Sequence, residues 1–320
     1  MSGRSGPRRL PAHRALAALV VVLVAVPAGG QDVLAQGTAT LVRDINTLGA
    51  GSGATPLTPA GGAMLVSACQ ADGQRSILAV GGPEDELITL TTVGSCEESA
   101  VRWALTVGER AFFTLGAGWA DLWVTDGTPE GTTTVANLWM DEPGVDLGGV
   151  LYLEARDRTS GGGLELWRSD GTADGTYRLR DIRAGENGSW PEGLTVVGDR
   201  LFFAATTRSA GRELWMSDGS ELGTVLVRDI HPVAGADPSD LTEAGGSLFF
   251  AADDGSTGRE LWRSDGTADG TRRVRNIRPG SASSAPQQLT AADGRLFFSA
   301  NDGIHGRELW SSDGTSAGTP

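Results

Sequence analysis

The chain has 320 residues, with 40 acidic and 26 basic side chains and a formal net charge of −14. All of the basic residues are Arg, and such a negative surface repels phosphate backbones, so we expect no nucleic-acid partner. The 47 Gly, and a content of only 6% aromatic residues that includes nine Trp, indicate a β protein with many turns.

Residues 1–35 have the pattern of a signal peptide. Four Arg precede the uncharged apolar run 15–26, and Val33-Leu34-Ala35 offers a small-residue cleavage site. An uncleaved anchor is the alternative, but the run is shorter than the roughly 20 residues that a spanning helix needs. Removal of residues 1–35 leaves 22 basic and 39 acidic side chains, a charge of −17. We therefore predict a secreted or cell-surface protein, extracellular or periplasmic, without a membrane span after cleavage.

The two cysteines, Cys69 and Cys96, both lie in the exported part. An even number of cysteines in an oxidising compartment favours a disulfide, here closing a loop of 26 intervening residues. A catalytic thiol would need a nearby His, and no His is close in the sequence. We predict a structural bridge.

A module of about 47 residues repeats six times along the chain. The first copy is degenerate, with Leu78 where later copies have Trp. The predicted modules are residues 56–93, 98–138, 145–182, 190–230, 238–277 and 285–320. The repeated tryptophans are Trp123, Trp167, Trp215, Trp262 and Trp310.

Each module is predicted to contain four short antiparallel strands. In residues 190–230 these are 194–197, the apolar run 201–205, 213–216 and 225–230, separated by Gly-containing turns. No amphipathic helix of useful length follows residue 35. The order of strands predicts an antiparallel meander.

The Ser-Asp-Gly-Thr segments are expected to form the turn between the third and fourth strands. Asp accepts a hydrogen bond from an N–H two residues on, and Gly adopts positive φ. The aspartates are Asp126, Asp170, Asp218, Asp265 and Asp313. We interpret the Trp two residues after each acidic residue of the third strand as a wedge between modules; an aromatic ligand platform is the alternative. The repeated Arg-Glu steps are expected to pair across strands or blades.

Six modules fit a six-bladed β-propeller. The chain ends where the fourth strand of the last module should begin, and residues 37–46 contain Leu41-Val42-Arg43-Asp44-Ile45, which matches residues 226–230. We predict that this N-terminal strand completes the last blade and that the protein is a monomer. The alternative is a fragment of a longer array, cut within a repeat.

Four near-identical copies, such as Glu213-Leu214-Trp215 followed by Ser217-Asp218-Gly219, resemble the motif of the ELWxxDGT repeat proteins, which are exported bacterial proteins sometimes labelled hyalin-like. The resemblance is good over residues 110–320 and weak over 37–110. It implies export and a repeat fold, but no assigned activity. Residues 81–84 depart from the motif in the first module.

Catalytic signatures are scarce. The sequence lacks clustered His and Cys for zinc or iron, a Gly-x-Ser-x-Gly elbow and a phosphate-binding glycine loop. No acidic residue stands apart from the repeat as a buried singleton, although the 39 acidic residues after position 35 give many possible carboxylate pairs for glycoside hydrolysis. Calcium is the ion that the sequence favours, because hard cations prefer oxygen ligands. The weak candidate ligands are Asp253, Asp254 and Asp302, in turns that also suit solvated loops.

The resulting hypothesis is an exported, non-catalytic β-propeller that binds an extracellular glycan or protein, with no cofactor apart from this calcium. A propeller hydrolase or lyase acting on extracellular glycans, and a segment of a larger surface array, are the alternatives. Several acidic or polar side chains converging from different blades would favour catalysis, whereas repeat-equivalent residues would favour scaffolding.

Overall fold

The computed structural model describes residues 53–81, 86–97, 100–115, 119–158 and 162–319. All of its regular structure is β, and no helix occurs within these ranges. The prediction of an all-β protein is confirmed. The predicted signal peptide and the predicted closing strand, residues 37–46, lie outside the described residues.

The fourth sheet shows the repeated unit most clearly. Its strands pair in the order β13-β14-β15-β16, all antiparallel. The apolar run 201–205 is buried along its whole length because neighbouring sheets cover both faces of β14. The predicted four-stranded meander is therefore correct. The strands are β13 (Glu192–Val197), β14 (Arg200–Thr207), β15 (Gly211–Ser217) and β16 (Val225–Arg228).

The first and fifth sheets repeat this order. The first consists of β1 (Thr55–Ala60), β2 (Ala63–Cys69), β3 (Gln74–Gly81) and β4 (Glu86–Ser95). A disulfide joins Cys69 at the end of β2 to Cys96 just after β4, with the Cα atoms 5.7 Å apart. The bridge thus fastens the outer strand of this sheet. The fifth sheet consists of β17 (Ser239–Ala244), β18 (Ser247–Asp253), β19 (Arg259–Ser264) and β20 (Arg272–Arg275).

The second and third sheets are joined by strand pairing. Trp139 at the end of β8 pairs with Arg156 in β10, and Leu138 pairs with Asp157, so two meanders form one eight-stranded sheet. The second meander comprises β5 (Val101–Val107), β6 (Arg110–Leu115), β7 (Trp119–Thr125) and β8 (Thr133–Trp139). The third comprises β9 (Val145–Leu147), β10 (Val150–Asp157), β11 (Glu165–Ser169) and β12 (Tyr177–Arg180).

The last sheet has three described strands, paired in the order β21-β22-β23. They are β21 (Gln287–Ala292), β22 (Arg295–Asn301) and β23 (Arg307–Ser312). In each of the other sheets the strand equivalent to β23 pairs with a fourth strand.

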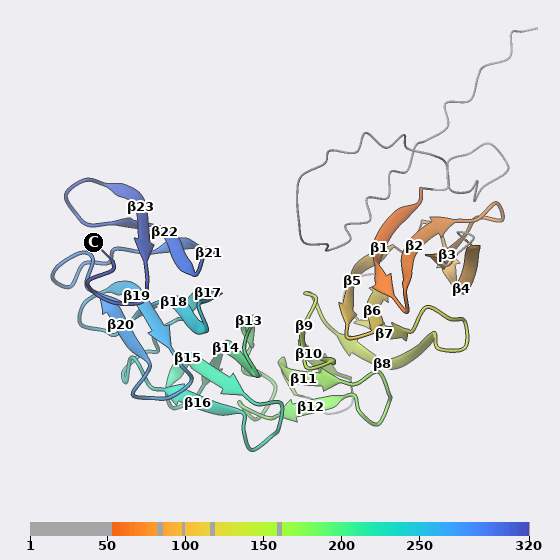
Figure 1. The fold of residues 1–320 in the computed structure, drawn as a ribbon. Coiled ribbons are helices and arrows are strands. Elements are labelled where there is room, and N and C mark those ends of the chain that lie inside the picture. Colours follow the sequence, from red (N-terminus) through yellow and green to blue (C-terminus); the bar gives the residue numbers. More distant parts are fainter. Residues whose placement is uncertain (1–52, 82–85, 98–99, 116–118, 159–161, 320) are drawn as a thin grey trace, which may run out of the picture.

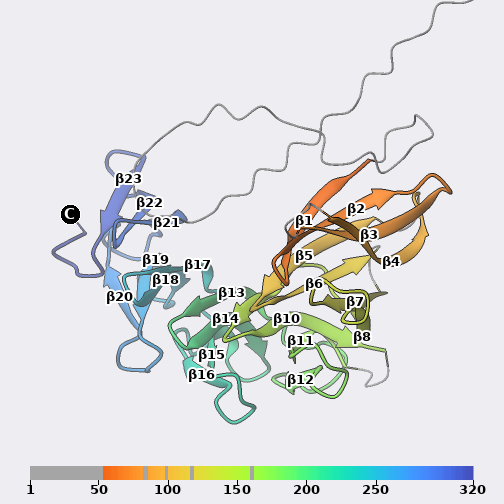
Figure 2. The ribbon, with the colours of Figure 1, turned by 45° about the vertical axis from the view of Figure 1, so that its right-hand side comes forward.

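The sheets follow one another along an arc, with the first strand of each sheet on its inner side (Figure 1). First strands of successive sheets contact one another, from β1 and β5 through to β17 and β21. The first and last sheets stand at the two ends of the arc, as the turned view also shows (Figure 2). The described strands thus form an open arc.

The core lies between neighbouring sheets in five clusters. Between the fourth and fifth sheets, for example, Phe202 and Leu214 pack against Leu248, Phe250 and Trp262. Each sheet therefore buries both of its faces only when it has neighbours on both sides.

The antiparallel order gives every sheet two ends. One end carries the connections from the fourth strand to the next sheet and from the second strand to the third; we call it the linker face. The other end carries the remaining turns, including the Asp-Gly turns; we call it the turn face.

Candidate functional site

The Asp-Gly turns on the turn face are self-contained. Asp218 Oδ1 accepts hydrogen bonds from Ser220 N at 2.9 Å and Ser220 Oγ at 2.6 Å, and these bonds hold the pKa of Asp218 below its usual value. Gly219 has a φ of +91°, and a Cβ at Gly223 would lie 1.9 Å from Asp218 Oδ1. Both glycines are therefore required by the turn. The same bonds recur at Asp126, Asp170, Asp265 and Asp313.

The repeated tryptophans lie between sheets. Trp262 is 5% exposed and its ring centroid lies 6.5 Å from that of Phe250, within the cluster shared with the fourth sheet. Trp167 and Trp215 are buried in the corresponding clusters, and Trp123 and Trp310 pack against theirs. These rings therefore pack in or against the core between sheets, as expected of a wedge.

The glutamate of the third, fourth and fifth repeats has a role that sequence reasoning missed. Glu213 is fully buried, and its carboxylate accepts the N–H groups of Ile230, His231 and Ala236 at 3.0–3.1 Å. Burial raises the pKa of Glu213 although these bonds oppose the shift. Glu165 and Glu260 make equivalent bonds to their linkers.

The expected Arg-Glu ladder is thus wrong for the glutamates. Each buried carboxylate instead fastens the linker to the next sheet. The sequence of the linker does not indicate this contact, because the acceptor carboxylate lies 17 or more positions earlier in the chain.

The calcium candidates are engaged by their own loops. Asp254 Oδ1 accepts the N–H groups of Ser256 and Thr257, and Oδ2 lies 2.9 Å from Arg273 Nη1. Burial opposes ionisation, but these hydrogen bonds outweigh it and lower the pKa of Asp254 to about 2. Asp253 accepts Gly255 N, and Asp302 accepts Ile304 N and His305 N.

No group of three His, Cys, Asp or Glu side chains with the arrangement of a metal site occurs in the part of the chain that the structure describes. Calcium binding in these loops stays a prediction.

Glu154 is an acidic residue that does stand apart from the repeat, which corrects the expectation from sequence. It occupies the place in β10 that Ala204 takes in β14, with a leucine of the third strand paired to each. Its Oε1 is buried and accepts no hydrogen bond from any described residue. Burial, followed by the nearby Glu192 and Asp141 carboxylates, raises the pKa of Glu154 to about 7.

Two ion pairs flank Glu154 on the linker face. Arg102 of β5 lies 2.6 Å from Asp141 in the linker to the third sheet, and Arg212 of β15 lies 2.8 Å from Glu192 at the start of β13. The second, third and fourth sheets all contribute to this group. We call these five residues the Glu154 cluster.

An aromatic group lies on the same face, where the second and third sheets join. The Arg156 guanidinium lies 4.9 Å from the ring centroid of Trp139 and 5.5 Å from that of Trp119, and the Arg158 guanidinium lies 4.9 Å from Trp119. Such stacking holds two guanidinium groups in place. Trp119 and Trp139 fall outside the repeated motif, and that departure is the signal that the sequence offered.

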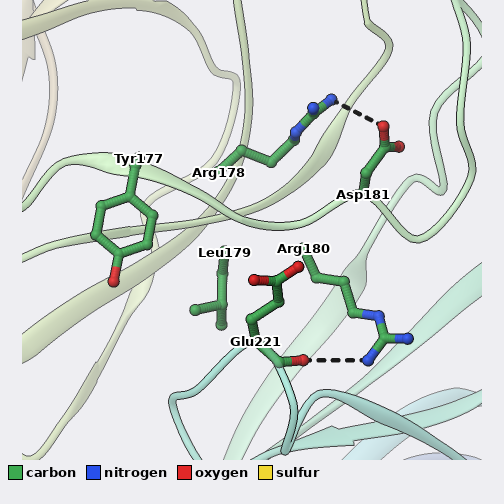
Figure 3. A pocket seen from close by; sticks show the side chains of 6 residues that line it. All are labelled: Tyr177, Arg178, Leu179, Arg180, Asp181 and Glu221. Carbon is green, nitrogen blue, oxygen red and sulfur yellow. Dashed lines mark hydrogen bonds and ion pairs between the residues drawn. The ribbon is translucent and has the colours of Figure 1, made fainter.

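A pocket on the outer side of the third sheet is lined in part by charged side chains that already have partners. It is lined by β12 and by Glu221 of the next sheet's Asp-Gly turn (Figure 3). Arg178 pairs with Asp181 at 3.4 Å, and Arg180 donates to the backbone oxygen of Glu221 at 3.1 Å. Both arginines in this pocket therefore have partners, and the Arg180 contact joins the third sheet to the fourth.

No family model matches the chain, and no curated protein matches it either. Two solved structures similar to it are an acylaminoacyl peptidase from Pyrococcus horikoshii, at 14% identity and a TM-score of 0.39, and a structure from a study of two prolyl endopeptidases, at 11% identity and a TM-score of 0.39. The matches cover 82% and 83% of this chain. The chain spans less than half of each structure, 44% and 48%.

Proposed function

We propose that the protein is an exported six-bladed β-propeller, of the ELWxxDGT repeat kind, that binds an extracellular glycan or protein on its linker face without turnover. The six successive sheets on an arc support the blade arrangement. The Cys69–Cys96 disulfide supports export, since such bridges persist in oxidising compartments. Among the described residues there is no helix of sufficient length and apolar character to span a membrane.

One observation carries the location of the binding site: the departures from the repeat gather on one face. The turn face shows the same Asp-Gly hydrogen bonds in five sheets. The linker face of the second to fourth sheets instead carries the Glu154 cluster and the stacked Trp119, Trp139 and Arg156. Charged and aromatic groups of this kind suit the hydroxyls and apolar ring faces of a sugar, or a polar protein surface.

The test is a glycan array probed with residues 36–320, with and without a calcium chelator. A Trp119→Ala variant should lose at least tenfold in signal. Glu130→Gln, an exposed substitution on the turn face, is the matched control and should bind as the unmodified protein does. Equal loss in both variants, or no binding in either calcium condition, would contradict the proposed site.

The second candidate is a hydrolase or lyase acting on extracellular glycans, and Glu154 is the observation that favours it. A carboxyl group with a pKa near 7 can serve as a general acid or base at neutral pH. Polysaccharides incubated with the protein should then yield new reducing ends, and Glu154→Gln should abolish their formation. An unchanged rate in Glu154→Gln would exclude this role.

A further inference from the structure

The last sheet has an edge that every other described sheet covers. Leu309 of β23 is 77% exposed, whereas its equivalents Leu166, Leu214 and Leu261 are 0% exposed. In those sheets the leucine pairs with an Arg of the fourth strand, as in Leu214 with Arg228. A large apolar side chain at a free strand edge indicates a missing partner strand.

Glu308 shows the same deficit. It is exposed, whereas Glu165, Glu213 and Glu260 at the same repeat position are at most 1% exposed. Those carboxylates accept the N–H of an Ile just after the fourth strand, namely Ile182, Ile230 and Ile277. Glu308 has the position but lacks this donor among the described residues.

Residues 40–45 have the residue types that the edge requires. Arg43 aligns with Arg180, Arg228 and Arg275, and Ile45 aligns with the three isoleucines above. Val42 aligns with Val227 and Val274, which are 7% and 6% exposed and face the core. The segment therefore reproduces both the apolar and the charged side of a fourth strand.

The connection to the first sheet matches the other linkers in length and pattern. Eleven residues separate Arg43 from Thr55 at the start of β1, as they separate Arg180 from Glu192 and Arg275 from Gln287. Ser52 follows Ile45 by seven positions, as Ser189 follows Ile182 and Ser284 follows Ile277. Both of those serine hydroxyls donate to the buried glutamate.

The described end of this connection also has the linker conformation. Gly53 has a φ of +56°, and the aligned Trp190 and Ala285 have φ values of +53° and +48°. Left-handed backbone at Trp and Ala is uncommon, so its recurrence marks a specific linker geometry. The first sheet is thus preceded by the kind of linker that elsewhere follows a fourth strand.

We propose that Leu41–Ile45 binds the β23 edge of its own chain as the fourth strand of the last sheet. The register of the other sheets places Arg43 opposite Leu309, Leu41 opposite Trp310 and Thr40 opposite Ser311. Glu308 then accepts the Ile45 N–H and the Ser52 hydroxyl. A linker of ordinary length brings the two ends of the arc together and closes a ring of six sheets.

A second copy of the chain is the competing occupant, because its residues 41–45 would fit the same edge and produce an open chain of molecules. The curvature of the arc favours the same chain, because it turns the last sheet back toward the first (Figure 1). This proposal does not depend on the ligand-binding function.

A cysteine pair, Thr40→Cys with Ser311→Cys in residues 36–320, distinguishes the two occupants. Directly opposed residues of antiparallel strands have the Cα separation that a disulfide needs. We expect most of the protein to form a cross-link within one chain, independent of protein concentration, as seen by mass spectrometry and light scattering. The matched control, Ala39→Cys with Ser311→Cys, points its cysteine to the opposite face and should cross-link at least tenfold more slowly.

Cross-linked dimers and larger species that increase with concentration would assign the edge to a second copy and overturn the proposal. Absence of cross-linking in both variants would also overturn it. Hydrogen exchange on the unmodified protein provides a measurement free of substitutions: the amides of 41–45 should be protected as strongly as those of 225–228. Unprotected amides there would refute strand formation.

Discussion

Replacing Glu213 with Ala should release the linker between the fourth and fifth sheets. Three N–H groups, of Ile230, His231 and Ala236, would lose their acceptor in a buried place. Each buried donor left without a partner costs about 1–3 kcal/mol. The carboxylate also carries a desolvation cost, seen in its raised pKa, and that cost disappears in the Ala variant. We therefore expect a loss of about 3–5 kcal/mol, near the lower half of the summed range.

The assay is urea unfolding of residues 36–320, with hydrogen exchange to locate the change. Asp121→Ala is the matched control, because Asp121 holds the same repeat position in the second sheet but is exposed. Among the described residues, its carboxylate accepts a hydrogen bond only from the Asn137 side chain, at 2.8 Å. Its loss should stay below about 1 kcal/mol. Faster exchange in Glu213→Ala should centre on residues 230–236. Equal destabilisation by the two substitutions would show that the buried carboxylate does not fasten the linker.

Other substitutions test separate features. Trp262→Ala should lower the free energy of unfolding by about 3–5 kcal/mol, because a buried wedge is removed. Calorimetry measures the loss. A smaller loss than in Trp190→Ala, whose side chain is 47% exposed, would contradict the wedge. The free energy of unfolding of Glu154→Gln should equal that of the unmodified protein near pH 4.5 and exceed it at pH 8. The pKa of Glu154 rises from 4.5 to about 7 on folding, so the folded state loses stability as pH rises through that window. With allowance for partial exposure the gain is on the order of 2 kcal/mol, and a variant less stable at pH 8 would refute it. Removing the disulfide by Cys69→Ala with Cys96→Ala should cost about 3 kcal/mol, measured by urea unfolding; an unchanged midpoint would show that the bridge does not limit the unfolded chain.

Much of the fold follows from the sequence because each repeat has the same apolar strand run and the same Asp-Gly turn. The run 201–205 forms a strand buried on both faces, and Asp218-Gly219 forms the turn after β15. The joining of β8 to β10 was not foreseen. It depends on the length of β8, which has 7 residues where β12, β16 and β20 have 4, and its extra residues meet β10 only after the sheets have packed.

The candidate site was less accessible to sequence reasoning. Glu154 differs from Ala204 at a single repeat position, and its significance comes from burial beside Glu192 and Asp141, which approach from other parts of the chain. Trp119 and Trp139 could have been noticed as tryptophans outside the motif. Their stacking with Arg156 required the paired strands.

The strand pairing between the second and third sheets affects how the protein would yield under mechanical load. In a row of units that contact only their neighbours, extension from the two ends should release one meander after another. The pair bonded through Trp139 and Arg156 has no such boundary. Force spectroscopy would then record one long extension step spanning β5 to β12, among shorter steps for the remaining meanders.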